Sequence, residues 1–284
     1  MKQSKADLVQ RYREALKRCL DGFTRLDDKD WAKKASDHWT AKEHLAHLVS
    51  NTEDELLVIT RQAIAGQPAS VPGFAKQDDA IAFHNAGVEK LRDLPVLDLI
   101  QRWWSAVEQH ISMLEELDEG MLDKPASSPA WSREGTIRDL LAAGYLFLPG
   151  QYQQIRRVNK KKLPHWLDDG PPERVNFHLD RLFNYMALIL NAGSAADTQA
   201  IYLMNLEGPG GGQWRLKINN GTAFCEDGTG MEHDVEIKTK PVHWMDLASG
   251  DLNPPMAIMT RKVKLGGNAG LAMKLGSLFG STGG

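Results

Sequence analysis

Apolar residues recur at steps of three and four through most of the first two thirds of the chain, which is the period of helices that bury one face. These stripes predict long helices over residues 4–26, 40–59, 95–117 and 136–155, with a shorter helix over about 77–93. Thr40 and Glu43 have the spacing of a capping box, so the second helix is expected to begin at Thr40. Long amphipathic helices joined by connections of some length predict an all-α four-helix bundle.

Pro149 lies inside the last of these stripes. Proline lacks an amide hydrogen and clashes with the preceding helical turn, so we expect a kink or a break near Tyr145–Leu148.

Beyond residue 191 the apolar period changes to two, which is typical of strands with one buried face. Strands are predicted over residues 200–206, 214–218, 222–225, 233–239 and 261–265, and helices over 173–191, 241–248 and 268–279. Trp214, Leu216 and Ile218 alternate with basic residues, which places them on one apolar face. Asn220-Gly221 is a strong hairpin signal. Helices combined with a small, mostly antiparallel sheet predict an α+β domain.

Glycine usage divides the chain at the same place. Nine of the 25 glycines fall in residues 1–191 and sixteen in residues 192–284. The segment 159–172, NKKKLPHWLDDGPP, has a lysine run and several prolines that disfavour regular structure. We therefore expect a helical bundle over residues 1–160, a linker over 161–171 and an α+β domain over 172–284.

The balance of charge argues against a nucleic-acid partner. The chain has 34 basic and 37 acidic side chains and a formal net charge of −3. Such a balance gives no general attraction to nucleic acid or anionic lipid, although it is compatible with a local basic patch.

Cysteine usage and hydropathy together favour a cytoplasmic protein. Cys19 and Cys225 are far apart and form neither a metal-binding pair nor a disulfide framework, which fits a reducing compartment. The longest apolar stretch, 140–149, is about half of the roughly 20 residues that span a bilayer. We expect no stable membrane insertion.

The histidines of the second helix are the first candidates for chemistry. His44 and His47 stand three residues apart, a spacing that can bring both to one side of a helix. His47 lies off the apolar stripe, toward the polar side. One interpretation is that these histidines act as metal ligands or as acid–base groups. The other, which the residues alone favour, is that both are solvated or capped. His84 and His110 are isolated in the sequence, and no catalytic residue can be assigned.

The second-helix motif WTAKEHLAHLV, Trp39–Val49, resembles the corresponding helix of DinB-like four-helix bundles, including the N-terminal domain of mycothiol-dependent maleylpyruvate isomerases. Residues 135–141 and 154–156 resemble the frame of their fourth helix, so the resemblance covers about residues 5–160. It implies a divalent metal held by His47 and by two fourth-helix positions near Phe147 and Gln151. Phenylalanine cannot bind a metal and glutamine is a poor ligand, so the resemblance implies that the zinc or nickel site is degraded. No cofactor can therefore be assigned from the sequence.

The last third of the chain resembles sterol-carrier-protein-type domains. Residues 213–221 resemble the sheet hairpin of that family, 244–250 its short helix and turn, and 259–279 its closing strand and helix. The family encloses fatty acyl chains or sterols in an apolar tunnel, so the implied partner is an apolar small molecule. The residues expected to line the site are Trp214, Leu216, Ile218, Met245, Met256, Met259, Leu271, Leu275 and Phe279. The methionines are equally compatible with plain core filling.

Two functions of different classes follow from the sequence. The first is a soluble two-domain binding protein with an apolar ligand in its C-terminal domain and a bundle that acts as a scaffold. The alternative is a metal- and thiol-dependent isomerase or transferase of the maleylpyruvate isomerase type that uses His47. The missing fourth-helix donors favour the first, because metal catalysis needs a filled inner coordination shell. The sequence leaves the identity of the ligand and the oligomeric state open.

Overall fold

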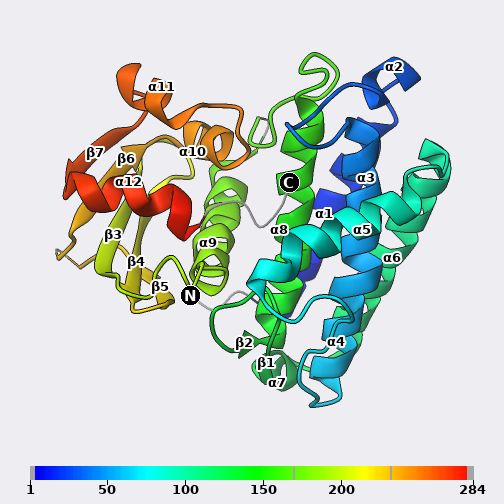
Figure 1. Cartoon of the computed structure of the whole chain (residues 1–284), viewed down its shortest axis with the longest axis horizontal. Helices are drawn as coiled ribbons and strands as arrows, with labels where there is room; N and C mark the ends of the chain where they lie inside the picture. Colours follow the sequence, from blue (N-terminus) through cyan, green and yellow to red (C-terminus); the bar gives the residue numbers. More distant parts are fainter. Residues whose placement is uncertain (1–3, 169, 231, 280–284) are drawn as a thin grey trace. The chain divides into compact units, whose positions relative to one another are not determined.

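The computed structural model describes residues 4–168, 170–230 and 232–279, and the chain divides into two compact units (Figure 1). The first unit contains the described residues up to Ala130 together with Glu134–His165. The second contains Trp131–Arg133 and the described residues from Trp166 onward. The predicted architecture, a helical bundle followed by an α+β domain, is confirmed.

The first unit is built from helices, with one very short hairpin. Its elements are α1 (Lys5–Phe23), α2 (Asp28–Trp31), α3 (Ala41–Ser50), η1 (Asn51–Leu56), α4 (Leu57–Ile64), η2 (Gln77–Asp79), α5 (Ala80–Leu91), α6 (Val96–Glu116), α7 (Glu119–Leu122), β1 (Pro125–Ala126), β2 (Gly135–Thr136) and α8 (Ile137–Arg156). Helix α1 packs on α6 and α8, and α3 packs on α5, α6 and α8. Aromatic rings fill the core between them, with Phe23 in contact with Trp31, Trp103 and Tyr152.

The predicted capping box at the start of α3 is confirmed. The Glu43 amide donates to Thr40 Oγ1 at 3.2 Å, and the Thr40 amide donates to Glu43 Oε2 at 2.7 Å. Thr136 and Asp139 form the same reciprocal pair at the start of α8. These caps satisfy backbone donors that a helix leaves without internal partners.

Two details of the helices differ from the prediction. Helix α8 runs unbroken from Ile137 to Arg156 through Pro149, so the helix does not break there, and the kink that was the alternative stays a prediction. Leu148, Pro149 and Tyr152 are all buried there, and this packing outweighs the one lost helical hydrogen bond. The single helix expected over 40–59 is instead interrupted by the π-helical turn η1, where Thr52 Oγ1 donates to the Leu48 carbonyl at 2.7 Å.

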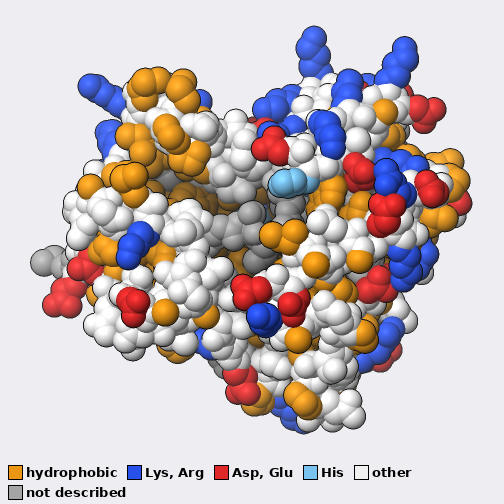
Figure 2. All heavy atoms as spheres, viewed as in Figure 1, with side chains coloured by type: hydrophobic (Ala, Val, Ile, Leu, Met, Phe, Trp, Pro, Cys, Tyr) orange, Lys and Arg blue, Asp and Glu red, His pale blue; other side chains and the backbone are white. Residues whose placement is uncertain are grey.

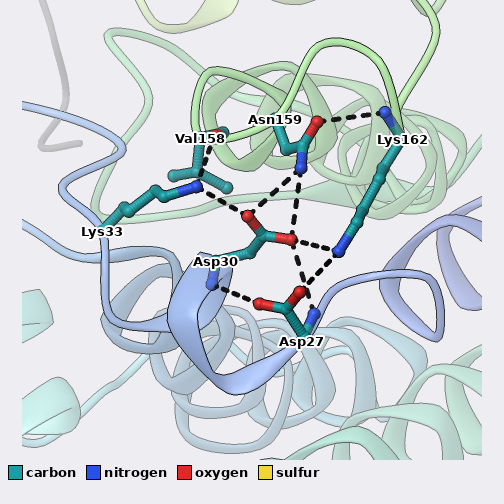
Figure 3. Close-up of polar contacts among 6 residues, drawn as sticks. All are labelled: Asp27, Asp30, Lys33, Val158, Asn159 and Lys162. Atoms are coloured by element: carbon teal, nitrogen blue, oxygen red, sulfur yellow. Dashed lines mark hydrogen bonds and ion pairs between the residues drawn. The ribbon is translucent and has the colours of Figure 1, made fainter.

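Residues that follow α8 are tied to α2 by one buried carboxylate, that of Asp30 (Figure 3). Asp30 accepts hydrogen bonds from Lys33 Nζ at 2.7 Å and Lys162 Nζ at 2.6 Å, and its Oδ1 also accepts one from Asn159 Nδ2 at 3.2 Å. Lys162 also pairs with Asp27 at 2.8 Å. Residues 159–162 therefore form part of the first unit, and the domain division at 161–171 stays a prediction.

The second unit pairs a five-stranded sheet with helices. Its elements are α9 (Pro172–Leu188), β3 (Gln199–Leu206), β4 (Gly212–Asn219), β5 (Thr222–Asp227), β6 (Val235–Thr239), α10 (Pro241–Ala248), α11 (Pro254–Met259), β7 (Lys264–Gly267) and α12 (Ala269–Leu278). The strand order is β5-β4-β3-β6-β7, and only the central pair β3–β6 is parallel. Asn220 and Gly221 both have positive φ, 46° and 89°, as the hairpin signal predicts.

One face of this sheet and the helices share a single apolar core. Alternate residues of the strands point into it, including Tyr202, Trp214, Leu216 and Ile237. The opposite face carries charged side chains, such as the ion pair between Lys217 and Glu226. The unit is therefore a two-layer α+β domain.

Candidate functional site

His47 lies in the interior of the bundle. This residue is only 1% exposed to solvent. Its ring contacts those of Trp39, His84 and Phe147 at centroid distances of 4.7, 4.7 and 5.2 Å. Nδ1 of His47 has no hydrogen-bond partner within the described part of the chain. The expectation that His47 faces the polar side is wrong, because α5 packs on α3 and covers that side.

His44 is buried as well, so neither histidine is solvated. Its Nδ1 lies 2.8 Å from Gln151 Oε1 and its Nε2 lies 3.0 Å from Ser36 Oγ. The Gln151 oxygen can only accept, so Nδ1 donates and Nε2 accepts from the serine hydroxyl. Burial lowers the pKa of His44 to about 4, and burial together with the nearby His84 and His44 lowers the pKa of His47 well below its ordinary value. Both rings are therefore neutral at neutral pH.

His84 is the site residue that sequence reasoning missed. It is isolated in the sequence, yet its ring lies against that of His47. Its Nε2 lies 3.3 Å from Glu55 Oε2, an oxygen that also accepts from Asn51 Nδ2 at 2.7 Å. Gly87 is the sequence signal that could have indicated this contact. An added Cβ there would collide with the Ser50 side chain, so glycine lets α5 approach α3 closely.

His110, by contrast, is a core residue whose polar atoms are satisfied. It is fully buried, with Nδ1 3.1 Å from the Tyr12 hydroxyl and Nε2 3.1 Å from Thr60 Oγ1. Both ring nitrogens therefore have partners.

The donor set does not fit the divalent metal that the resemblance implies. Phe147 presents its ring to His47 where a ligand is expected, and Gln151 is engaged by His44. Within residues 4–168, 170–230 and 232–279, no group of three His, Cys, Asp or Glu side chains is arranged to hold a metal ion. A transition-metal site needs about three such donors, so His47 has no competent partners on α8.

Protein purified without chelator is expected to contain well under one equivalent of zinc or nickel, because the described residues offer no group of three donors around His47. Elemental analysis of the native chain and of His47→Ala checks this. A full equivalent in the native chain that disappears in His47→Ala would overturn the expectation.

The second candidate site is the apolar core of the second unit. Trp214, Leu216 and Ile218 are buried in it from β4, and Leu271, Leu275 and Phe279 from the α12 region are half-buried against it. Six of the nine residues predicted to line a ligand site are thus brought together.

The three predicted methionines lie elsewhere. Met245 is buried on α10 but is outside that core. Met256 and Met259 are 46% and 71% exposed, so neither is buried in that core. Helix α11 has six residues and buries Ala257 instead, which leaves both methionines on its outer side.

Few polar groups enter this core. The Tyr202 hydroxyl donates to the Leu271 carbonyl at 2.8 Å and ties α12 to the sheet. Burial, with a smaller contribution from Asp234, raises the pKa of Tyr202 to about 12, so the phenol stays protonated. Trp214 Nε1 donates to Asp180 Oδ1 at 3.3 Å, whereas the buried Trp244 Nε1 has no partner among the described residues.

Two family models match the chain one after the other. The DinB superfamily matches residues 8–148, and the SCP-2 sterol transfer family matches residues 190–280. The chain therefore carries a DinB-like domain followed by an SCP-2-type domain, as the two resemblances predict.

Solved structures show the same order of folds. The mycothiol-dependent maleylpyruvate isomerase structure matches with a TM-score of 0.58 and 13% identity, over 89% of this chain and 91% of that chain. At this identity the match establishes the fold alone.

Curated relatives match over shorter stretches. Hydroxysteroid dehydrogenase-like protein 2 of Homo sapiens is 38% identical over 83 residues, 29% of this chain and 20% of that protein. The Xenopus tropicalis protein of that name is 30% identical over 103 residues, 36% of this chain and 25% of that protein. The chain thus spans a quarter or less of their length. None of the helices in the described residues is long and apolar enough to cross a membrane.

Proposed function

We propose that this protein binds an apolar ligand of the fatty acyl or sterol class in its C-terminal unit, and that the bundle is a scaffold without a catalytic metal. The observation that carries the proposal is the SCP-2 sterol transfer match over residues 190–280. The same residues supply the apolar sheet face and the covering helices α10, α11 and α12.

The ligand is proposed to lie between the sheet face and α12. Helix α12 buries Ala272 and Leu278, while Leu271 and Leu275 remain half-buried. Helix α12 is held by these two buried side chains and by two hydrogen bonds, from the Tyr202 hydroxyl to the Leu271 carbonyl and from the Asn191 amide to the Leu278 carbonyl. We propose that it moves outward to admit a chain. Burying a few hundred Å² of apolar ligand at roughly 25 cal/mol/Å² gives several kcal/mol before ordering costs, so micromolar affinity is expected.

Trp244 supports a ligand that has one polar end. Its ring packs on Phe183 at a centroid distance of 5.4 Å, and its buried Nε1 lacks an acceptor among the described residues. A buried donor without a partner is costly, and a carboxylate or hydroxyl oxygen of a ligand would satisfy it. Fatty acids and sterols both have one such oxygen-bearing end.

A fluorescent fatty acid is expected to bind the native chain saturably with micromolar affinity, and at least about tenfold more weakly after Leu275→Gln, because a half-buried apolar contact is replaced by an amide. Deletion of residues from Asn268 onward is expected to weaken binding further. Fluorescence titration measures both.

Met273→Gln on the same helix is the matched control, because Met273 is 85% exposed and its loss should leave the affinity unchanged. Near-UV circular dichroism checks that each variant keeps its packing. Absence of saturable binding to fatty acyl and sterol probes by the native chain would refute the proposed function.

The alternative function is a metal- and thiol-dependent isomerase or transferase that uses His47. The domain order it shares with maleylpyruvate isomerase favours it. The phenylalanine facing His47 counts against it. A full equivalent of metal in the elemental analysis would restore this alternative.

A further inference from the structure

Three polar side chains of the first unit are joined by two hydrogen bonds through one imidazole ring. Ser36 lies in the segment between α2 and α3, His44 lies on α3, and Gln151 lies on α8. His44 Nε2 lies 3.0 Å from Ser36 Oγ, and His44 Nδ1 lies 2.8 Å from Gln151 Oε1. All three residues are buried, and we name them the Ser36–His44–Gln151 triad.

The direction of each hydrogen bond follows from the groups that take part. The amide oxygen of Gln151 can only accept, so it fixes the His44 tautomer that carries its proton on Nδ1. The lone pair of His44 Nε2 therefore accepts from the Ser36 hydroxyl. A hydroxyl that donates to an imidazole, whose other nitrogen is held by a third group, is the arrangement that activates a serine nucleophile.

A tight turn holds Ser36 in place beside His44. The amides of Ala35 and Ser36 donate to the Trp39 carbonyl at 3.0 and 3.1 Å, and the Trp39 amide donates back to Ser36 Oγ at 3.1 Å. The Trp39 ring also lies against the His44 ring, edge to face, at a centroid distance of 5.3 Å. The hydroxyl and its base are therefore both fixed by the fold, which favours reaction over a freely rotating serine.

The same turn reaches the surface and supplies backbone donors. Figure 2 shows lysine, arginine and acidic side chains at the surface over α2, the helix that precedes this turn. Asp37 and His38 follow Ser36 directly and are exposed, whereas Ser36 itself is 8% exposed. Among the described residues, the amides of Asp37 and His38 donate to no other group. They are therefore available to an oxyanion that forms when the serine attacks a carbonyl carbon.

The electrostatics of the triad limit how fast it can react. Burial keeps the His44 ring neutral at neutral pH, so its Nε2 lone pair is available to take a proton. Gln151 carries no charge, so it orients the ring without stabilising the imidazolium that forms, as the carboxylate of a Ser-His-Asp triad does. Slow turnover is therefore expected, and covalent labelling of the serine is the more sensitive measurement.

We propose that the Ser36–His44–Gln151 triad is a metal-free acyl-transfer site that hydrolyses small acyl esters, which the slight exposure of Ser36 favours over bulky ones. The bond from Ser36 Oγ to the carbonyl carbon forms as the hydroxyl proton passes to His44 Nε2. The bond to the leaving alkoxide then breaks as His44 gives it that proton. Water attacks the acyl-serine by the same route and releases a carboxylic acid and free Ser36.

This activity gives the bundle a role beyond that of a scaffold. It resides in the first unit and does not depend on the ligand proposed for the second. Gln151 is a positioning residue in this scheme, because it acts only through His44.

Labelling of the full chain with a fluorophosphonate tests the nucleophile, because an activated serine displaces fluoride and forms a bond from its oxygen to phosphorus. Tandem mass spectrometry is expected to find the label on Ser36, at a rate that added chelator does not change. Ser36→Ala should abolish this label. His44→Gln should slow it at least about 100-fold, the lower end of the effect of a general base. Hydrolysis of p-nitrophenyl acetate should fall in parallel.

Two substitutions of Gln151 separate a positioning role from a merely structural one. Gln151→Leu removes the acceptor that fixes the His44 tautomer and should slow labelling about tenfold or more. Gln151→Glu keeps an acceptor oxygen and adds a charge that stabilises the imidazolium, so it should label at least as fast as the native chain. This pair decides the matter even where His44→Gln fails to fold.

Ser112→Ala removes an exposed serine from α6 and is the matched control, which should label like the native chain. Near-UV circular dichroism checks the packing of every variant. Absence of label on Ser36, or label that His44→Gln leaves unchanged in a folded variant, would overturn the proposal. Equal slowing by Gln151→Leu and Gln151→Glu would overturn it as well, because the triad would then be a structural network only.

Discussion

Phe183→Ala is expected to destabilise the second unit by about 3–5 kcal/mol, the range for truncating a buried phenylalanine. Phe183 is fully buried, and its ring packs against Trp214 and Trp244 at centroid distances of 4.9 and 5.4 Å. Truncation removes aromatic contacts from α9, β4 and α10 at once and leaves a cavity that these elements cannot easily close. Urea unfolding monitored by tryptophan fluorescence measures the loss of stability.

The matched control is Phe224→Ala on the opposite face of the sheet. Phe224 is 52% exposed and its ring lies 4.3 Å from the Arg133 guanidinium, so its loss should cost at most about 1 kcal/mol. Similar costs for the two substitutions would mean that the apolar core described above does not determine the stability of the unit.

Asp30→Asn is expected to lower the stability of the bundle by about 2 kcal/mol at neutral pH, since hydrogen bonds to a charged group contribute more than neutral ones while partly exposed partners reduce the gain. The hydrogen bonds from Lys162 and then Lys33 hold the pKa of Asp30 far below its ordinary value of 3.8. A carboxyl with a lowered pKa stabilises the fold fully above its unfolded pKa, and this stabilisation fades as the pH falls below about 4. The difference between native and variant chains should therefore shrink in acid.

The same substitution should loosen the lysine segment after α8. Asn159 and Lys162 lose a buried acceptor, so trypsin should cleave after Lys160, Lys161 or Lys162 faster in Asp30→Asn than in the native chain. Mass spectrometry of the first fragments locates the cut. Asp28→Asn, an exposed neighbour on α2, is the control and should change neither stability nor cleavage. Equal cleavage of all three proteins would show that the Asp30 carboxylate does not hold this segment.

Features that depend on neighbouring residues could be predicted from the sequence. The Thr40–Glu43 cap and the Asn220-Gly221 turn need only a few residues to specify their hydrogen bonds or backbone angles, and both have the expected geometry. The alternation of Trp214, Leu216 and Ile218 likewise identified the buried face of β4. Local chemistry decides these features, so a single sequence suffices.

Contacts between distant segments could not be predicted in this way. The pairing of His47 with His84 depends on how closely α5 approaches α3, which Gly87 permits but no periodicity reveals. The resemblance to DinB-like bundles directed attention to α8, where Phe147 and Gln151 do lie beside His47 and His44. It gave no information about α5, since the implied ligands come from other helices. The exposure of Met256 and Met259 could not be predicted for a different reason. Helix α11 has only six residues, which are too few for an apolar pattern to show which side is buried.

The π-helical turn η1 has a consequence for how this chain should be aligned with others. A wide turn of this kind accommodates one residue more than a regular helix of the same rise, and in an α-helix one residue corresponds to a rotation of about 100°. His47 lies before that extra residue, whereas Glu55, which bonds His84, belongs to the turn itself. A homologue whose helix is regular there would need a one-residue gap within 51–56, and an ungapped alignment would pair one of these two residues with the wrong position.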